Sequence, residues 1–209
     1  SVELKNLSRQ FLYTEADIGE PKLERAVARA RALNSGMTIT PVERRVTGPD
    51  DIADLLPGID LVLAVIDQPA EVRNWINEAC IAASVPFITG GVGVIRGAYW
   101  SVSPGTSGCQ ACLRAQQGTD RRIAFPEQVN RAIGPAAGLV GSLIGLEAVR
   151  YLTGFAPPIS AGRMWLADLA TGQIDIGYSW ERVPDCPVCG RDAAPITARE
   201  AAAVAVEVQ

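Results

Sequence analysis

The longest aliphatic run in the chain predicts a strand buried in a parallel sheet. Residues 59–66 are apolar except for Asp60, and Asp67 follows the run directly. A continuous apolar run is typical of a strand that is covered on both faces. A helix opened by Pro69 and a second apolar run at 85–88 complete a strand–helix–strand unit. The pattern therefore predicts two parallel strands with Asp67 at the carboxyl end, where open α/β sheets bind ligands.

The segment before this unit is less regularly patterned. Residues 1–13 crowd polar side chains together and predict a loop. Pro21 suits the first turn of a helix that continues to Leu33 with an approximate helical spacing of apolar residues. Residues 37–46 predict a strand, and residues 49–58 predict a short helix that a Pro-Gly pair ends.

A glycine-rich string from Gly90 to Gly97 resembles a phosphate-binding loop in composition. Phosphate loops lead into a helix, whose N-terminus supplies free N–H groups and a favourable dipole. Here the residues that follow, 98–102, have the pattern of a strand. The string therefore favours glycines that allow close packing, with the phosphate loop as the alternative.

The second half of the chain predicts one long helix and one hairpin. Residues 134–152 form the helix, which carries closely spaced small residues: Ala137, Gly138, Gly141, Ser142 and Gly145. Such a face permits tight packing against another element, such as a second subunit. Residues 164–167 and 173–180 predict the hairpin, and residues 114–131 predict an irregular surface crossover.

Two Cys-x-x-Cys pairs stand far apart in the chain, Cys109 with Cys112 and Cys186 with Cys189. Four thiolates complete the tetrahedral shell that zinc prefers, and such a closed site leaves no coordination position for catalysis. Each pair also carries a glycine, which tolerates a positive φ or a close backbone approach. The alternatives are two disulfides or a redox pair, but disulfide frameworks belong to small secreted chains. The pattern favours a structural zinc ion.

Composition narrows the chemistry that the chain can perform. The 209 residues are 48% apolar and 20% charged, a balance typical of globular domains. The net charge of −4 and the absence of histidine argue against nucleic-acid binding and exclude a histidine base. No apolar run suits a membrane span, and we expect a reducing cytoplasm. Cys80 lies on the apolar face of a predicted helix and is interpreted as a packed thiol, so catalysis must use Arg, Lys and Asp.

Seven short sequence strings occur along nearly the whole chain in the same order as in one known protein family: VELKNLSRQF, GEPK, VIDQ, NEAC, GCQACLR, GPAAGLVGSLIGLEAVRYLTG and CPVCG. Each string is weak alone, but seven in register are specific. Together they resemble the bacterial ThiF, MoeB and HesA adenylyltransferases of the ubiquitin-activating-enzyme-like superfamily. The resemblance implies an α/β fold, with a Rossmann-like parallel sheet flanked by helices, an antiparallel extension and a four-cysteine zinc site.

The resemblance also implies a reaction. This family uses ATP to adenylate the C-terminal carboxylate of a ubiquitin-like sulfur carrier or a peptide, with release of pyrophosphate. The residues that match its catalytic ATP and Mg²⁺ ligands are Arg9, Lys22 and Asp67, while Asn6 matches a nucleotide contact and Gln10 lies in the same string. The four cysteines match the family's structural zinc ligands. A cytoplasmic homodimer that binds neither nucleic acid nor membrane is expected.

Electrostatics agrees with these roles. Attack of a carboxylate on a phosphate builds negative charge, so positioned cations give most of the help and no general base is required. Arg9 offers a planar fork of donors, Lys22 a point charge, and Asp67 an oxygen ligand for magnesium. The plainer alternatives are that Asp67 caps a helix and that Arg9 and Lys22 are solvated surface charges.

Two departures from the family bear on this interpretation. A first strand, a GxGxxG turn, and a second strand with a ribose-binding Asp are not found before Ser1, so residues 1–209 are interpreted as one domain truncated at its N-terminus. Residues 1–90 would be the remaining nucleotide part, and residues 91–209 the extension with the zinc knuckles and the long helix. Residues 113–135 also lack the cysteine that some relatives use for a covalent link, which predicts release of the acyl adenylate to a separate sulfur donor.

Two other functions are kept as alternatives. A catalytically silent scaffold subunit would dimerise with an active paralogue and bind no nucleotide. An NAD-dependent oxidoreductase would use a similar sheet, but no histidine or Tyr-Lys pair is evident for proton transfer.

Overall fold

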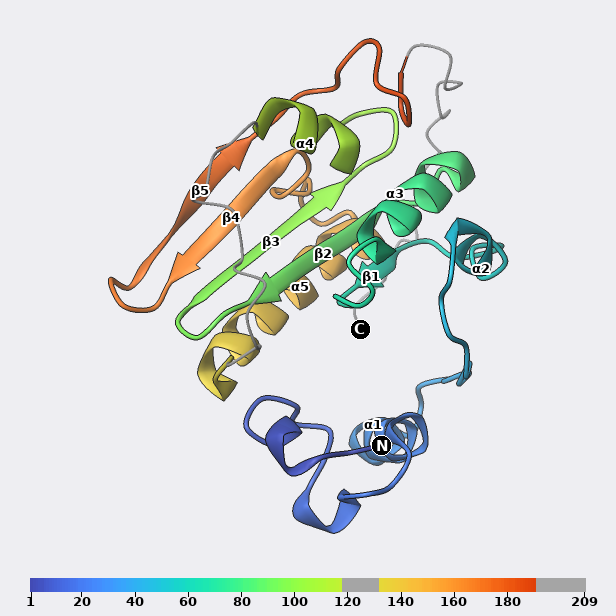
Figure 1. Ribbon diagram of the computed structural model, residues 1–209, viewed down its shortest axis with the longest axis vertical. Coiled ribbons are helices and arrows are strands. Elements are labelled where there is room, and N and C mark those ends of the chain that lie inside the picture. Colours follow the sequence, from blue (N-terminus) through green and yellow to red (C-terminus); the bar gives the residue numbers. More distant parts are fainter. Residues whose placement is uncertain (118–131, 191–209) are drawn as a thin grey trace, which may run out of the picture.

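The computed structural model describes residues 1–117 and 132–190, and its centre is a mixed five-stranded sheet (Figure 1). The strands lie side by side in chain order: β1 (Val62–Ala64), β2 (Phe87–Val92), β3 (Arg96–Val102), β4 (Arg163–Asp168) and β5 (Gln173–Ser179). β1 and β2 are parallel, and each later pair is antiparallel. The predicted parallel unit and its antiparallel extension are confirmed, and within the described residues the parallel part comprises β1 and β2.

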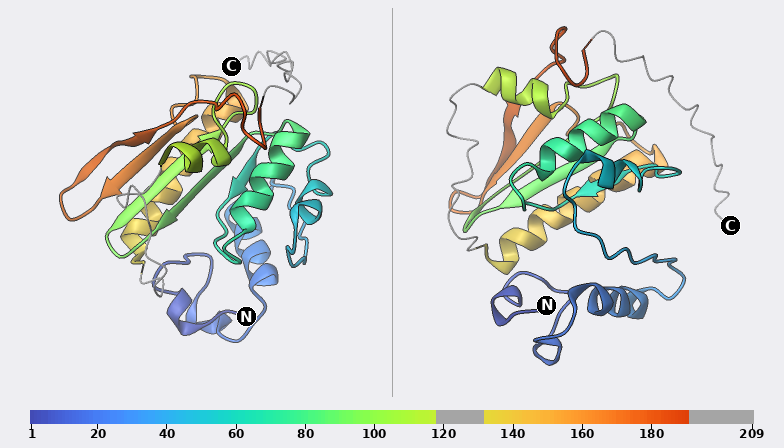
Figure 2. Two further views of the ribbon diagram at one scale, coloured as in Figure 1. Left: turned by 45° about the horizontal axis from the view of Figure 1, so that its top comes forward. Right: turned by 45° about the vertical axis from the view of Figure 1, so that its right-hand side comes forward.

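Helices cover both faces of the sheet, as Figures 1 and 2 show. α5 (Gly134–Thr153) lies across one face, while α3 (Val72–Ala83) and α4 (Gln110–Gln117) lie on the opposite face. α2 (Pro49–Ala53) packs beside α3, and α1 (Lys22–Leu33) lies with the N-terminal segment below the sheet in Figure 1. The helices predicted from apolar spacing are therefore present, with ends that differ by a few residues.

The core follows the two-residue period of the central strands. Phe87 and Trp100 point to the cluster that includes α3 and α4, whereas Ile88 and Tyr99 pack against α5. Neighbouring positions in a strand point to opposite faces, so each strand contributes to both clusters. The sheet is thus held between two apolar layers.

Glycines allow the hairpin between β2 and β3 to lie close to its neighbours. A Cβ atom on Gly90 would lie 2.7 Å from the carbonyl oxygen of Ala98, and one on Gly97 would overlap the side chain of Val140. β2 continues through this hairpin into β3, and no helix begins there. Close packing is confirmed as the reason for Gly90 and Gly97, and the phosphate-loop alternative is wrong.

The strand predicted at residues 37–46 does not form. The backbone there pairs with no strand of the described residues, and Met37 and Val42 are exposed. A strand needs a partner for its N–H and C=O groups, and apolar alternation alone does not provide one. Arg44 instead donates to the carbonyl oxygen of Asp51 at 2.9 Å and to the carboxylate of Asp54 at 3.3 Å.

The aliphatic run at 59–66 is only partly a buried strand. β1 occupies three of its residues, and the side chains of Leu63 and Val65 are 49% and 69% exposed. Among the described residues β1 pairs with β2 alone, and the exposure of Leu63 and Val65 shows that the prediction of two covered faces is wrong for these side chains.

The predicted irregular segment at 114–131 begins as a helix. α4 extends to Gln117, so residues 114–117 are helical, and residues 118–131 lie outside the described residues. On α5, Gly138 would place a Cβ atom 3.6 Å from the ring of Phe11, while Gly141 and Gly145 face open space. Packing of this small-residue face on a second subunit stays a prediction. Within the described residues, no helix is both long and apolar enough to cross a membrane.

Candidate nucleotide site and metal centre

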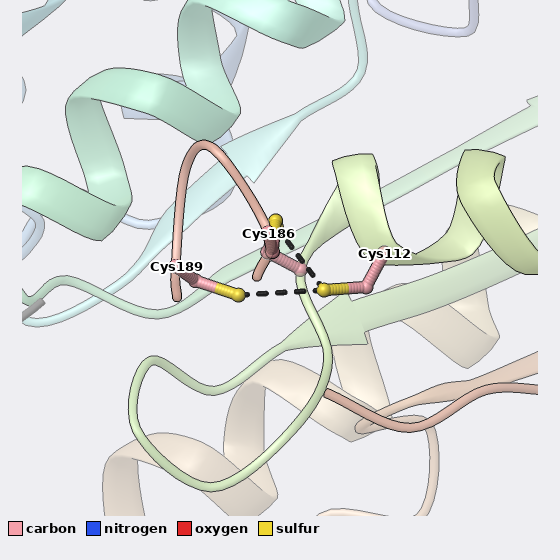
Figure 3. A group of neighbouring side chains, drawn as sticks. Cys112, Cys186 and Cys189 are labelled. Carbon is pink, nitrogen blue, oxygen red and sulfur yellow. Dashed lines mark hydrogen bonds between the residues drawn. The ribbon is translucent and has the colours of Figure 1, made fainter. Parts of the chain in front are cut away.

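The four cysteines of the two knuckles meet in one buried cluster. Cys109 directly precedes α4 and Cys112 lies in its first turn, while Cys186 and Cys189 belong to the loop after β5. Figure 3 shows the sulfurs of Cys112, Cys186 and Cys189 turned toward one another. All four sulfurs lie within 4.8 Å of one another. The prediction that the distant pairs form one site is confirmed.

The sulfur spacing fits a tetrahedral zinc site and does not fit disulfides. The distances from Cys109 to Cys186 and from Cys112 to Cys189 are 3.6 and 3.4 Å, and that from Cys109 to Cys112 is 3.9 Å. A tetrahedron with Zn–S bonds near 2.3 Å has edges of about 3.8 Å, whereas a disulfide bond is about 2.05 Å long. All four cysteines are free thiols, so the disulfide alternative is wrong.

The protein environment tunes the thiols unequally. Burial raises the pKa of Cys112 to about 11, although the backbone N–H of Val183 donates to its sulfur at 3.3 Å. Burial also opposes ionisation of Cys186, but hydrogen bonds from the backbone N–H groups of Cys189 and Val188 lower its pKa to about 7. Four buried thiolates in one cluster require a cation, and this donor set is the one that zinc prefers.

The two knuckle glycines are explained by close backbone approach. A Cβ atom on Gly190 would lie 2.6 Å from the carbonyl oxygen of Cys186, and one on Gly108 would overlap the backbone of Glu181. The indole N–H of Trp180 donates to the carbonyl oxygen of Gly108 at 2.9 Å, which attaches β5 to the first knuckle. A larger residue at Gly190 would distort the second knuckle itself, and one at Gly108 would push the first knuckle away from Glu181.

Three predicted nucleotide residues share one turn in the N-terminal segment. Asn6 is 3% exposed, and its Oδ1 accepts from the N–H of Glu3 at 2.9 Å. Its carbonyl oxygen accepts from the N–H groups of Arg9 and Gln10 at 3.1 and 2.9 Å. The Arg9 guanidinium donates to the carbonyl oxygen of Lys5 at 2.9 Å, and the buried Gln10 side-chain oxygen has no hydrogen-bond partner in the part of the chain that the structure describes. Asn6 thus fixes this turn from inside.

Lys22 is joined to the same segment by backbone pairing. The N–H of Val2 donates to Glu20 at 2.8 Å, and the N–H of Gly19 donates back to Val2 at 2.9 Å. The hydroxyl of Tyr13 donates to the carbonyl oxygen of Lys22, the first residue of α1, at 3.3 Å. Asn6, Arg9, Gln10 and Lys22 therefore belong to one N-terminal unit.

Asp67 stands after β1, on the connection to α3. Its side chain is exposed, and α3 begins at Val72 with Glu71 at the N-cap position and no side-chain cap. The alternative in which Asp67 caps this helix is therefore wrong. Within the described residues, no hydrogen bond or ion pair joins Asp67 to Arg9 or Lys22. The connection that carries Asp67 and the N-terminal unit lie on the same side of the sheet in Figure 1.

Sequence reasoning missed Arg73, which lies in the first turn of α3, six residues after Asp67. Burial lowers the pKa of Arg73, and the charge of Asp67 partly offsets this effect. The sequence does contain one signal, because Arg73 is the sole Lys or Arg between residues 46 and 95. Its guanidinium lies over the ring of Trp100, a residue of β3. Spacing along the chain does not reveal this contact.

Comparison with known proteins settles the family. The model of the ThiF family matches residues 1–188. The chain belongs to the ThiF family. It is 34% identical over 190 residues to the sulfur carrier protein ThiS adenylyltransferase of Escherichia coli K12, covering 90% of this chain and 72% of that protein. It is 33% identical over 196 residues to the molybdopterin-synthase adenylyltransferase of the same organism, covering 91% and 74%.

Further relatives agree with this placement in the ThiF family. Protein HesA of Leptolyngbya boryana is 27% identical over 195 residues, covering 92% of this chain and 66% of that protein. The structure of E. coli MccB with ATP aligns with a TM-score of 0.79 at 23% identity, covering 91% of this chain. The present chain covers 57% of the length of MccB, and the likeness shows that the two proteins share a fold. The resemblance to ThiF, MoeB and HesA is confirmed.

Proposed function

We propose that this chain activates the C-terminal carboxylate of a ubiquitin-like sulfur carrier by ATP-dependent adenylation, with release of pyrophosphate. The observation that carries the proposal is the family match over residues 1–188. Both E. coli relatives described above are named adenylyltransferases, and one is named for the sulfur carrier protein ThiS. A peptide is the second candidate substrate, because MccB has been solved in complex with MccA. The lower identity to MccB, 23%, ranks this candidate after the sulfur carrier.

The reaction calls for cations and not for a base. A carboxylate oxygen of the substrate bonds to the α-phosphorus of ATP, and the bond from that phosphorus to the bridging oxygen of pyrophosphate breaks. The electron pair leaves with pyrophosphate, so negative charge grows on the phosphate oxygens. Arg9 and Lys22 would neutralise this charge, Arg9 through paired donors and Lys22 as a point charge. The attacking carboxylate is ionised at neutral pH, which suits a chain without histidine.

Asp67 has the right chemistry for a magnesium ligand. Magnesium is usually held by one or two carboxylates together with substrate phosphates, and bound there it would add positive charge at the phosphates. Asp67 is exposed at the carboxyl end of a parallel strand, where α/β sheets bind ligands. Asn6 and Gln10 would contact the nucleotide from the N-terminal unit.

The cysteine cluster has a separate role in this proposal. A zinc ion held by four sulfurs has no open position, so it would supply a crosslink and no chemistry. The crosslink would join α4 to the loop after β5, and Cys109, Cys112, Cys186 and Cys189 would hold it.

Pyrophosphate exchange into ATP tests the proposed function. The protein is expected to catalyse exchange only when a sulfur carrier ending in Gly-Gly is present. Asp67→Ala should abolish exchange, because the magnesium ligand is lost. Asp175→Ala, a matched change at an exposed carboxylate on β5, should leave exchange intact. Full exchange in Asp67→Ala would refute the role of Asp67, and a wild-type protein that binds no nucleotide would favour a scaffold subunit.

A further inference from the structure

The guanidinium of Arg73 stacks on the ring of Trp100 on the α3 side of the sheet, and the two side chains together are called the arginine platform. The guanidinium lies 5.6 Å from the centroid of the Trp100 ring, and its Nη2 donates to the carbonyl oxygen of Gly90 at 3.0 Å. Its Nε is buried and has no hydrogen-bond partner among residues 1–117 and 132–190. Trp100 itself is 2% exposed, so the platform rests on the core.

The charge of this platform is not balanced within the described residues. Arg73 takes part in no ion pair there, and Arg114 on α4 adds a second positive charge that disfavours its ionised form. Asp67 attracts Arg73 through space without contact. A half-buried charge without a counter-ion is costly, and an anion that binds there recovers part of that cost.

The platform lies at the edge of the sheet where the proposed chemistry takes place. Ala64, the last residue of β1, pairs with Thr89, and Arg73 reaches the next residue of β2, Gly90. Gly91 has no side chain to cover the guanidinium, since a Cβ atom there would lie 3.3 Å from Nη2. An anion on Arg73 would therefore lie by the carboxyl end of β1, toward the antiparallel part of the sheet.

Buried hydrogen bonds hold the platform in place. The indole N–H of Trp100 donates to the side-chain oxygen of Gln110 at 2.9 Å, and the N–H of Gln110 donates to the side chain of Asn77 at 2.9 Å. Gln110 lies between the two cysteines of the first knuckle. α3, α4 and β3 are thus tied together around Arg73, which gives it a fixed position.

We propose that Arg73 binds the C-terminal carboxylate of the substrate before it is adenylated. This inference rests on the proposed function and adds a recognition site to it. A guanidinium offers paired donors that match a carboxylate, and its position by the carboxyl end of β1 would orient that carboxylate toward a nucleotide bound there. A phosphate of ATP has the same anionic chemistry, but Arg9 and Lys22 already supply phosphate-binding cations from the N-terminal unit.

The test compares a Gly-Gly sulfur carrier as the free acid with the same carrier as a C-terminal amide. Without ATP, the wild-type protein should bind the acid about tenfold more tightly than the amide, and Arg73→Gln should bind both equally weakly. Arg73→Lys keeps a charge but loses the paired donors, and it should show an intermediate preference. Arg96→Gln, which removes an exposed arginine paired with Asp168, is the control and should keep the acid preference.

Three outcomes would overturn this inference. The first is an acid preference that survives in a folded Arg73→Gln protein, and the second is a wild-type protein without any acid preference. The third is a loss of ATP affinity in Arg73→Gln with unchanged carrier binding, which would assign the anion to ATP. Carrier-dependent pyrophosphate exchange by the wild-type protein is measured alongside. Its absence counts against the proposed function, whereas exchange with a preserved acid preference in Arg73→Gln counts against the role of Arg73 alone.

Discussion

At the scale of single residues, spacing predicted the metal centre, and it missed the arginine platform. The Cys-x-x-Cys motif occurs two times in the chain, so a metal site can be predicted before the contacts of the cysteines are known. Cys80 was also predicted, and it is fully buried with a pKa that burial raises to about 12. Arg73 is a single cation in α3, and its proposed role depends on its contact with Trp100 of β3. The role of Arg73 became visible only from its contact with Trp100, which local sequence patterns do not predict.

Removal of one knuckle thiol should release the metal and destabilise the fold. Cys112→Ser is expected to reduce bound zinc from one ion per chain to much less than one, because three sulfurs form an incomplete shell. Unfolding should become easier by at least about 2 kcal/mol, since the crosslink between α4 and the loop after β5 is lost. Metal analysis and denaturant unfolding measure the two effects. Cys80→Ala is the matched control, and retention of full zinc by Cys112→Ser would contradict the assignment.

At the scale of elements, local patterns predicted the helices and the β4–β5 hairpin better than the strands near the N-terminus. Helices satisfy their own backbone groups, so apolar spacing after a proline was sufficient for α1 and α3, and α5 was predicted as a helix with closely spaced small residues. A strand depends on a neighbour, and residues 37–46 have none in the part of the chain that the structure describes. The glycines of the β2–β3 hairpin were predicted to serve close packing, and the contacts of Gly90 and Gly97 show it.

Two glycine substitutions should change stability in opposite directions. Gly90→Ala places a methyl group 2.7 Å from a backbone oxygen and 3.0 Å from Ile144, so it should destabilise the protein by about 1–3 kcal/mol. Gly141→Ala meets no atom within 4 Å on an exposed face of α5, so it should raise stability by up to about 1 kcal/mol. Urea unfolding at one protein concentration compares the variants. Equal stabilities for both would show that the hairpin is not tightly packed.

At the scale of the whole molecule, the fold combines two parts that carry different halves of the proposed nucleotide site. Asn6, Arg9, Gln10 and Lys22 belong to the N-terminal unit, while Asp67 belongs to the sheet. The sequence strings shared with the family predicted that these residues act together. The spacing of apolar residues did not predict how the N-terminal unit lies relative to the sheet. The aliphatic run before Asp67 predicted a covered strand, yet β1 has exposed side chains. Apolar content shows what a strand is able to bury, and its neighbours determine what it does bury.

The affinity for magnesium ATP in a double-mutant cycle tests most directly whether the two parts hold one triphosphate. Lys22→Ala and Asp67→Ala are titrated singly and together by calorimetry in the protein. Each single change should weaken binding about tenfold or more, and the double change should cost clearly less than the sum of the two, because both groups act on the same phosphates. Unchanged affinity in the single variants, or strictly additive losses, would contradict convergence of Lys22 and Asp67 on ATP.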